Sequence, residues 1–281
     1  METQIKTLYA ADLDGTLLAP GAVLSRRSRE ALSSFLACGI TVTAATARTP
    51  ATVIPIFSGA GLNAPAALMN GVLLFDLPRK QILSAQTYSA EDKRAILPLC
   101  ENWPVSVMVY SLFENSLRVF FRKSSFAPMV RFIAERTGTP HKTWHEVKSY
   151  SEPSGSEVIY IAALGAKETL SEMEKDIKKA TSLRTALYRE VNFEGVWVLE
   201  AFSRAATKAA AIKRSAEICG ADRIVAFGDN LNDLPLFEGC DVSVAVANAV
   251  PDVIKAADFV CGANTADGVV EWIARDAGIK L

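Results

Sequence analysis

The chain has 281 residues, half of them apolar, with a formal net charge of −1 and a pI of about 6.2. This length allows one large domain or two of moderate size. Because acidic and basic residues nearly balance and form no long Lys/Arg block, the composition argues against nucleic-acid binding. No run of 18 apolar residues occurs, so we expect no membrane span.

The cysteines indicate a reducing compartment. All five are widely scattered and none forms a Cys-x-x-Cys pair, which disfavours a disulfide framework and a zinc site. The N-terminus lacks the basic region and apolar core of a signal peptide, so we expect a cytoplasmic protein.

In the first third of the chain, strands and helices alternate. The pattern predicts strands at Thr7–Ala11, Ile40–Ala45 and Ala66–Met69, and helices at Ser25–Ala37 and Ala51–Ser58. Ser25 is a candidate N-cap, and Gly39 should end the first helix.

The middle of the chain has a different pattern. Predicted strands at Val105–Tyr110, Leu117–Arg122, Val158–Ala163, Ala186–Arg189 and Val196–Ala201 suit a second sheet, with helices at Ser124–Thr137 and Lys167–Ala180. We expect a surface loop around His141 and His145, because Pro140 disfavours a helix that would let them share a metal. The prediction is an α+β insert at residues 84–202, hinged as a lid over a core formed by residues 1–83 and 203–281.

The last third alternates again. It predicts helices at Thr207–Cys219, Asn230–Phe237, Val250–Ala256 and Asp267–Ala277, and strands at Ile224–Phe227, Val242–Val246 and Phe259–Cys261. Short apolar strands separated by helices favour an α/β fold with a three-layer parallel sheet core. Ligands of such sheets bind beyond the carboxyl ends of the strands.

Two carboxylates follow the first predicted strand at just such an end, in the sequence Asp12-Leu13-Asp14-Gly15-Thr16. Like charges at the end of a buried strand are unfavourable unless a cation or a proton compensates them. A carboxylate nucleophile, a second carboxylate and a metal would form a phosphoryl-transfer site. The alternative is an Asp-Gly turn with no chemical role.

Other polar residues recur at the ends of the predicted strands. Asp229, Asn232 and Asp233 follow the strand at Ile224–Phe227, and Thr46 follows the strand at Ile40–Ala45. Lys208 lies near the start of a predicted helix.

This order of nucleophile, hydroxyl, lysine and acidic pair resembles the four motifs of the haloacid dehalogenase (HAD) superfamily of phosphatases. The long segment between the second and third motifs resembles that of the Cof-like subfamily IIB, with a type II cap. The resemblance implies a Rossmann-like core and Mg²⁺ as cofactor. Ala47 and Ala247 stand where relatives usually have glycine, which leaves the shape of the site beside Thr46 open.

By this resemblance Asp12 is the nucleophile, and Asp14 is the general acid and base, with its backbone carbonyl on the metal. Asp229 would complete the Mg²⁺ site, or cap the following helix. Asp233 would be a further metal ligand, or would order a metal-bound water.

The remaining candidates would bind phosphate or substrate. Thr46 would donate to a phosphate oxygen, and Lys208 would neutralise phosphate charge. Arg48 would contact substrate or a carboxylate of the core, or form a structural salt bridge. Asn70 would contact substrate, or belong to a hairpin turn with Gly71. Asn232 would donate to phosphate, or serve only near a helix cap.

The sequence therefore predicts a Mg²⁺-dependent phosphatase for small phosphate monoesters, with an aspartyl-phosphate intermediate. The resemblance implies sugar phosphates as the first expected substrates, followed by pyridoxal phosphate or a nucleotide. A phosphomutase of the same subfamily is the nearest alternative, and a non-catalytic binding protein on the same fold is a remote one. A small-molecule phosphate ester is the expected partner, and the protein should be a monomer or a small homo-oligomer.

Overall fold

The computed structural model describes residues 5–152, 156–190 and 193–281. Residues 1–4, which bear on the expected absence of a leader, lie outside this description. The chain forms two compact units. The core unit holds the residues up to Ser84 and from Ala206 onward, and the inserted unit spans Ala85–Ala205.

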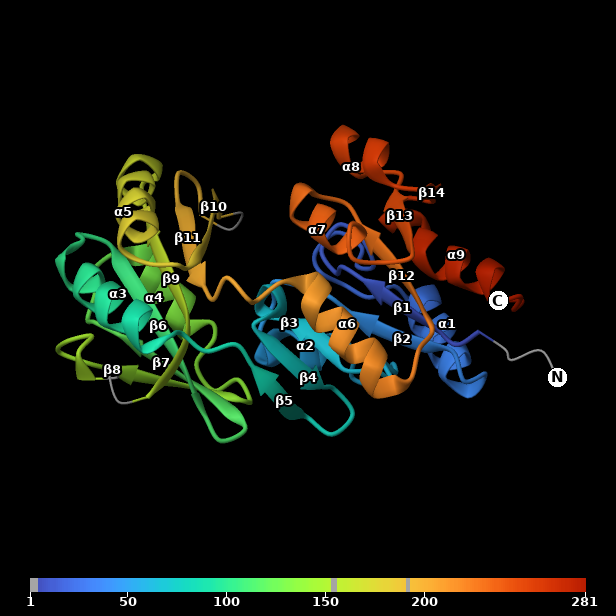
Figure 1. Ribbon diagram of the computed structural model, residues 1–281, viewed down its shortest axis with the longest axis horizontal. Helices are drawn as coiled ribbons and strands as arrows, with labels where there is room; N and C mark the ends of the chain where they lie inside the picture. The colour runs from blue at the N-terminus through green and yellow to red at the C-terminus, as the bar shows by residue number, and fades with distance from the viewer. Residues whose placement is uncertain (1–4, 153–155, 191–192) are drawn as a thin grey trace. The chain divides into compact units, whose positions relative to one another are not determined.

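The core unit is built on a five-stranded sheet in the order β14-β13-β12-β1-β2, with all neighbours parallel (Figure 1). Its strands are β1 (Thr7–Ala11), β2 (Thr41–Ala44), β12 (Arg223–Gly228), β13 (Val242–Val246) and β14 (Phe259–Cys261). β1 pairs with both β12 and β2, so the carboxyl ends of these three strands lie side by side. The predicted parallel α/β core is confirmed.

Two groups of helices accompany this sheet: α1 contacts α9, and α6 contacts α7, which contacts α8 (Figure 1). The helices are α1 (Arg26–Ala37), α2 (Pro50–Ile56), α6 (Lys208–Cys219), α7 (Leu234–Phe237), α8 (Pro251–Ala256) and α9 (Gly268–Asp276). The side chain of Ser25 caps α1 as predicted, and Gly39 follows its end with a φ of +73°. A small sheet in the order β3-β4-β5 lies beyond β2, with strands Ala66–Leu68, Leu73–Asp76 and Gln81–Ala85.

The start of α6 is fixed from two sides. The hydroxyl of Thr207 accepts a hydrogen bond from the Ala210 N–H at 2.9 Å, which makes Thr207 the N-cap and Lys208 the first helical residue. Gly71, which has a φ of +89°, packs against the backbone of Thr207. A Cβ at position 71 would lie 2.2 Å from the Thr207 carbonyl oxygen. Glycine is required at this contact, which holds Lys208 in a defined place.

The inserted unit contains a six-stranded sheet in the order β10-β11-β9-β6-β7-β8. Neighbouring strands are antiparallel, except that β7 and β8 are parallel. The strands are β6 (Ser106–Phe113), β7 (Ser116–Phe121), β8 (Lys142–Glu146), β9 (Glu157–Gly165), β10 (Arg184–Arg189) and β11 (Trp197–Phe202). The helices are α3 (Ala90–Asn102), α4 (Ala127–Ala134) and α5 (Lys167–Ala180).

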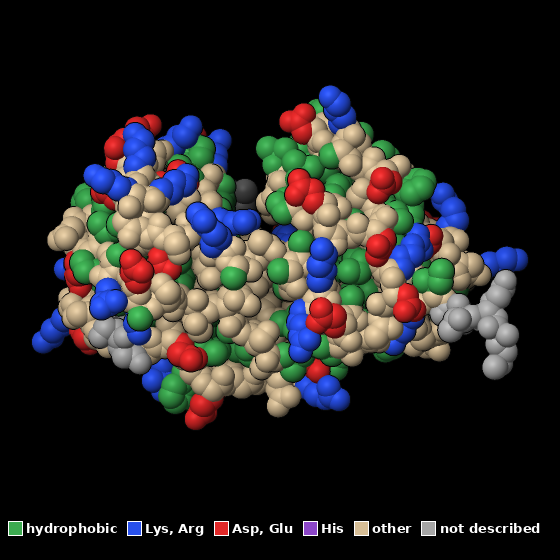
Figure 2. Space-filling model, in the orientation of Figure 1, with side chains coloured by type: hydrophobic (Ala, Val, Ile, Leu, Met, Phe, Trp, Pro, Cys, Tyr) green, Lys and Arg blue, Asp and Glu red, His purple; other side chains and the backbone are tan. Residues whose placement is uncertain are grey.

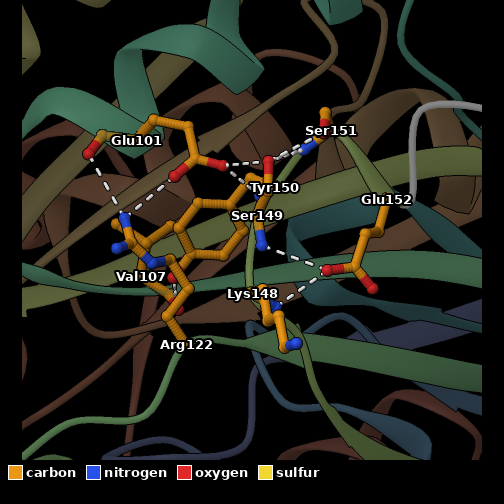
Figure 3. A network of polar contacts seen from close by, with 8 residues as sticks. All are labelled: Glu101, Val107, Arg122, Lys148, Ser149, Tyr150, Ser151 and Glu152. Atoms are coloured by element: carbon orange, nitrogen blue, oxygen red, sulfur yellow. Dashed lines mark hydrogen bonds and ion pairs between the residues drawn. The ribbon is translucent and has the colours of Figure 1, made fainter.

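One face of this sheet forms the core of the inserted unit with α3 and α5. Alternate residues of β6, β9 and β11 join apolar residues of both helices in one buried cluster. A polar network ties the C-terminal end of α3 to the segment after β8 (Figure 3). In it the carboxylate of Glu101 accepts from Arg122 at 2.8 Å and from the Ser149 hydroxyl at 2.6 Å, and the Tyr150 hydroxyl donates to the Val107 carbonyl at 2.7 Å.

The expected surface loop is correct for His141, which lies in a turn, and wrong for His145. His145 lies in β8, a strand at the edge of the sheet whose register pairs it with Phe120 of β7. The strand was missed because its sequence, Lys-Thr-Trp-His-Glu, is mostly polar. An edge strand gains its backbone hydrogen bonds from one neighbour and does not need an apolar pattern to do so.

β8 also contains a buried lysine. Lys142 is 5% exposed, its Nζ lies 5.1 Å from the centroid of the Trp144 ring, and no carboxylate of a described residue lies within ion-pair distance. Burial, with a smaller contribution from the charge of Arg136, lowers the pKa of Lys142 to about 8. The protonated amine therefore destabilises the fold at neutral pH.

Replacing this lysine by methionine should raise the free energy of unfolding, by on the order of 2–3 kcal/mol at about pH 7. Above the folded pKa the unfolded chain binds more protons than the native one, so wild-type stability rises with pH and the advantage of Lys142→Met shrinks towards about pH 10. Urea denaturation across this range measures the difference. An advantage that stayed constant, or a destabilised variant, would contradict this interpretation of Lys142.

No helix within the described part of the chain is both long and apolar enough to span a membrane. On the face displayed in Figure 2, basic and acidic side chains are interspersed over both units. This distribution agrees with the near-zero net charge and offers no extended basic surface on that face for a nucleic acid.

Candidate active site

Lys208 joins two carboxylates at the carboxyl ends of β1 and β12. Its Nζ donates to Asp12 at 2.8 Å and to Asp233 at 2.7 Å, and all three residues are buried. Asp12 directly follows β1, and its N–H donates to the Phe227 carbonyl of β12 at 3.0 Å. Residues 196 and 25 positions apart in the sequence thus meet at one ammonium group.

Asp229 lies beside this group, at the end of β12. Its carboxylate accepts from the Thr16 hydroxyl at 3.1 Å. Gly15, with a φ of +80°, lies so close that a Cβ there would be 2.3 Å from an Asp229 carboxylate oxygen. Asp12, Asp229 and Asp233 each offer one oxygen within 4.8 Å of the others. The turn after β1 therefore needs glycine to bring Asp229 towards Asp12.

The charges at this site do not balance. Burial raises the pKa of Asp12, Lys208 lowers it, and the neighbouring Asp233 and Asp229 raise it further. Burial also raises the pKa of Asp229, with Asp233 as the next cause. Burial alone would lower the pKa of Lys208, but Asp12 and Asp233 outweigh it and raise that pKa.

Three ionised carboxylates against one ammonium leave two negative charges, which one divalent cation would offset. The donor set is entirely oxygen, which suits Mg²⁺. Asp233 differs from the other two carboxylates: one oxygen accepts from Lys208, and the other accepts from the N–H groups of Asp229 and Asn230 at 3.1 and 3.3 Å. With both oxygens engaged, Asp233 is better placed to fix Lys208 and the β12 turn than to coordinate a metal directly.

Asp14 lies two residues beyond Asp12 and is paired with Arg48. The Nε and Nη2 groups of Arg48 donate to the two oxygens of Asp14, each at 2.6 Å, and hold the carboxylate in a bidentate pair. Of the alternatives that the sequence left open for Arg48, the structure shows contact with a carboxylate of the core, that of Asp14. The Asp14 side chain is nonetheless 55% exposed.

Thr46 is 1% exposed at the end of β2, and its hydroxyl accepts from the Arg48 N–H at 3.3 Å. Asn70 has left-handed backbone angles, and its N–H donates to the Thr46 carbonyl at 3.0 Å. These contacts bring the turn after β3 to the end of β2. Asn232 is exposed, and its side chain makes no hydrogen bond to a described residue, so the structure does not join it to the Asp12–Lys208 group.

Two further asparagines shape the site: Asn230 was missed, whereas Asn248 was expected from the sequence only as part of a loop-shaping element. Asn230, not Asp229, is the N-cap of the short helix that follows, in a capping box with Asp233. The Asn248 amide donates to the Gly15 carbonyl at 2.7 Å and so anchors the turn after β1. The Asn-x-x-Asp spacing of residues 230–233 was a readable signal for the cap, whereas the Asn248 contact spans 233 positions and is invisible in the sequence.

A family model described as haloacid dehalogenase-like hydrolase matches residues 9–273 of this chain. Pyridoxal phosphate phosphatase YbhA of Escherichia coli is 25% identical over 287 residues, with 95% of this chain and 97% of that protein covered.

Solved structures resemble the whole chain. A haloacid dehalogenase-like hydrolase from Bacteroides thetaiotaomicron superposes with a TM-score of 0.78 at 23% identity, covering 96% of this chain and 99% of that one. The HAD subclass IIB sugar phosphatase BT4131 gives a TM-score of 0.71 at 22% identity, covering 98% of this chain and 100% of that one. At these identities the likeness concerns the fold.

Proposed function

This chain belongs to the haloacid dehalogenase-like hydrolases and is a phosphatase, and we propose that it uses Mg²⁺ to hydrolyse sugar phosphates or similar small metabolites through a phosphorylated Asp12. The observation that carries the proposal is the pair of bonds from Lys208 to Asp12 and Asp233, beside Asp229. This arrangement holds one carboxylate where an oxygen can attack phosphorus, with a fixed positive charge next to it.

In the first half-reaction, an oxygen of Asp12 attacks phosphorus as the bond from phosphorus to the ester oxygen breaks. Lys208 keeps Asp12 oriented, and Thr46 and Lys208 are the groups we assign to the phosphoryl oxygens. Asp14, in its acid form, gives the leaving oxygen its proton, so the alcohol departs neutral.

In the second half-reaction, Asp14 takes a proton from water, and the water oxygen attacks the phosphorus of phosphorylated Asp12. The bond from phosphorus to Asp12 breaks, inorganic phosphate leaves, and both carboxyl groups return to their starting forms.

We assign the side chains of Asp12 and Asp229, with the backbone carbonyl of Asp14, to Mg²⁺, while Asp233 positions Lys208 and the β12 turn. When bound, the cation offsets the repulsion between these carboxylates and an incoming phosphate. The excess of two negative charges over Lys208 supports this assignment.

The substrate class is a separate part of the proposal. Asp12, Thr46 and Lys208 are assigned to the phosphoryl group, which all phosphate monoesters share. These three residues therefore cannot distinguish one ester from another by its alcohol part. Sugar phosphates come first because a solved neighbour with 98% coverage of this chain is named a sugar phosphatase. Pyridoxal phosphate comes second, because it is the substrate named for the E. coli relative.

The test is phosphate release from a panel of hexose phosphates, pentose phosphates, pyridoxal phosphate and nucleotides, with Mg²⁺ and with excess chelator. We expect turnover with Mg²⁺, at least a hundredfold loss in chelator, and recovery when Mg²⁺ is restored. Full activity in chelator would reject the metal assignment. No release from any ester would reject the enzyme activity, and conversion of a hexose 1-phosphate to its isomer without free phosphate would identify a phosphomutase instead.

A further inference from the structure

The ion pair between Arg48 and Asp14 sets the orientation of a half-exposed carboxylate. Both bonds measure 2.6 Å, and they engage both carboxylate oxygens with two groups of one planar guanidinium. Among the described residues, Arg48 is the only donor bonded to the Asp14 side chain. Without Arg48, that carboxylate would be free to rotate in solvent.

Arg48 is itself well held. Its N–H donates to the Thr46 hydroxyl at 3.3 Å, and its carbonyl accepts from the Met69 N–H at 3.0 Å. Its side chain is 24% exposed, and the bond to Asp14 is the first cause that raises its pKa. The turn after β2 therefore presents a fixed guanidinium to the turn after β1.

We propose that Arg48 is a positioning residue, which aims Asp14 at the leaving oxygen in the first half-reaction and at water in the second. The inference rests on the proposed function and adds a residue that acts through Asp14, not on the phosphoryl group. Proton transfer depends steeply on placement, because donor and acceptor must lie within hydrogen-bond reach. Arg48 need not touch the substrate for its loss to slow the reaction.

This role has a signature that a general structural role lacks. An alkyl phosphate releases a strongly basic alkoxide, which needs the proton from Asp14, whereas 4-nitrophenyl phosphate releases a weakly basic phenolate, which does not. The parameter kcat/KM reports only the steps up to phosphoryl transfer to Asp12. Misplacing Asp14 should therefore lower kcat/KM for the alkyl ester far more than for the aryl ester.

The experiment compares wild type and Arg48→Gln on the best alkyl phosphate from the panel and on 4-nitrophenyl phosphate. We expect kcat/KM to fall about 10- to 100-fold for the alkyl ester and less than about threefold for the aryl ester. Hydrolysis of phosphorylated Asp12 should also slow, because water loses its base. Rapid mixing of Arg48→Gln with the aryl ester should then give a burst of nitrophenol.

The matched control is Arg223→Gln. Arg223 also forms a two-bond pair with an aspartate of the core unit, donating to Asp276 at 2.8 and 3.3 Å, but at the amino end of β12. We expect this variant to keep wild-type kinetics on both esters. Arg48→Lys keeps the positive charge but cannot donate two parallel hydrogen bonds to Asp14. It should show the same selective loss of kcat/KM as Arg48→Gln, but a smaller one. If Arg48→Gln does not fold, the comparison is made with Arg48→Lys.

An equal loss of kcat/KM on both esters would overturn the inference, because it would mean that Arg48 binds the phosphoryl group or only supports the fold. Unchanged kinetics would overturn it as well. Failure of the proposed function is distinct from either result, because wild type itself would then release no phosphate from either ester.

Discussion

Replacing Asp12 by asparagine is expected to lower phosphatase turnover at least about a thousandfold while the protein stays folded. The amide has nearly the shape of the carboxylate, so its oxygen can still accept from Lys208, but it is not a nucleophile. Asp12 is buried beside two further carboxylates, and burial raises its pKa. Removing its charge relieves that repulsion, so the thermal unfolding temperature should not fall.

The measurement pairs steady-state phosphate release with acid-quenched trapping of the phosphorylated chain. Wild type should carry phosphate on Asp12 during turnover, and Asp12→Asn should carry none. Asp14→Asn is the matched control. In this variant Asp12 should still accept the phosphoryl group of 4-nitrophenyl phosphate, but the phosphorylated Asp12 should be hydrolysed slowly. Normal turnover by a well-folded Asp12→Asn variant would show that Asp12 is not the nucleophile.

The elements around the site were readable from the sequence because their signals are local. The apolar run before Asp12 is β1 with the predicted bounds, and the pattern after Thr207 is α6, with Lys208 in its first turn. Alternation of short apolar strands with helices was enough to predict a parallel sheet, and the carboxyl ends of such strands share one edge.

The missed elements had weak local patterns. α3 contains Pro98 and several charged residues, although Ser89 caps it and three residues later Asp92 bonds back to the Ser89 hydroxyl. That spacing is a helix start signal, and the sequence analysis did not use it. β8 lies at a sheet edge and is mostly polar, so its partner β7 determines it more than its own sequence does.

Most of the contacts between elements inside the site could not be predicted from the sequence. The pairing of Arg48 with Asp14 spans 34 positions and was one of the alternatives that the sequence left open. The contact of Gly71 with Thr207 depends on how the turn after β3 packs against α6. Such contacts follow from packing between elements, which residue patterns within one element do not encode.

Replacing Lys208 by methionine is expected to abolish turnover and to lower the free energy of unfolding by about 3–5 kcal/mol. Lys208 is 4% exposed, and methionine fills a similar volume without a charge. Its loss leaves Asp12 and Asp233 buried without their counter-ion. Asp233 keeps two backbone N–H donors, so Asp12 should account for most of the cost.

The charged form of Lys208 is stable although its position in the helix is unfavourable for a cation. Lys208 is the first residue of α6, where the positive end of the helix dipole disfavours a cation by some tenths of a kcal/mol. Two buried ion pairs of 2.7 and 2.8 Å outweigh this unfavourable interaction with the helix dipole. The lysine is thus held by the carboxylates and not by the helix, which is why removing it should affect both stability and activity.

A double variant separates these two effects. Adding Asp233→Asn to Lys208→Met removes one buried charge that has lost its counter-ion, so urea denaturation should recover part of the lost stability. Turnover should stay absent because the ammonium group that orients Asp12 is missing. Lys213→Met is the matched control, since Lys213 is an exposed lysine of the same helix, and we expect no change in stability or rate. If Lys208→Met alone were as stable as wild type, the ion pairs would not be the interaction that holds Asp12 in place.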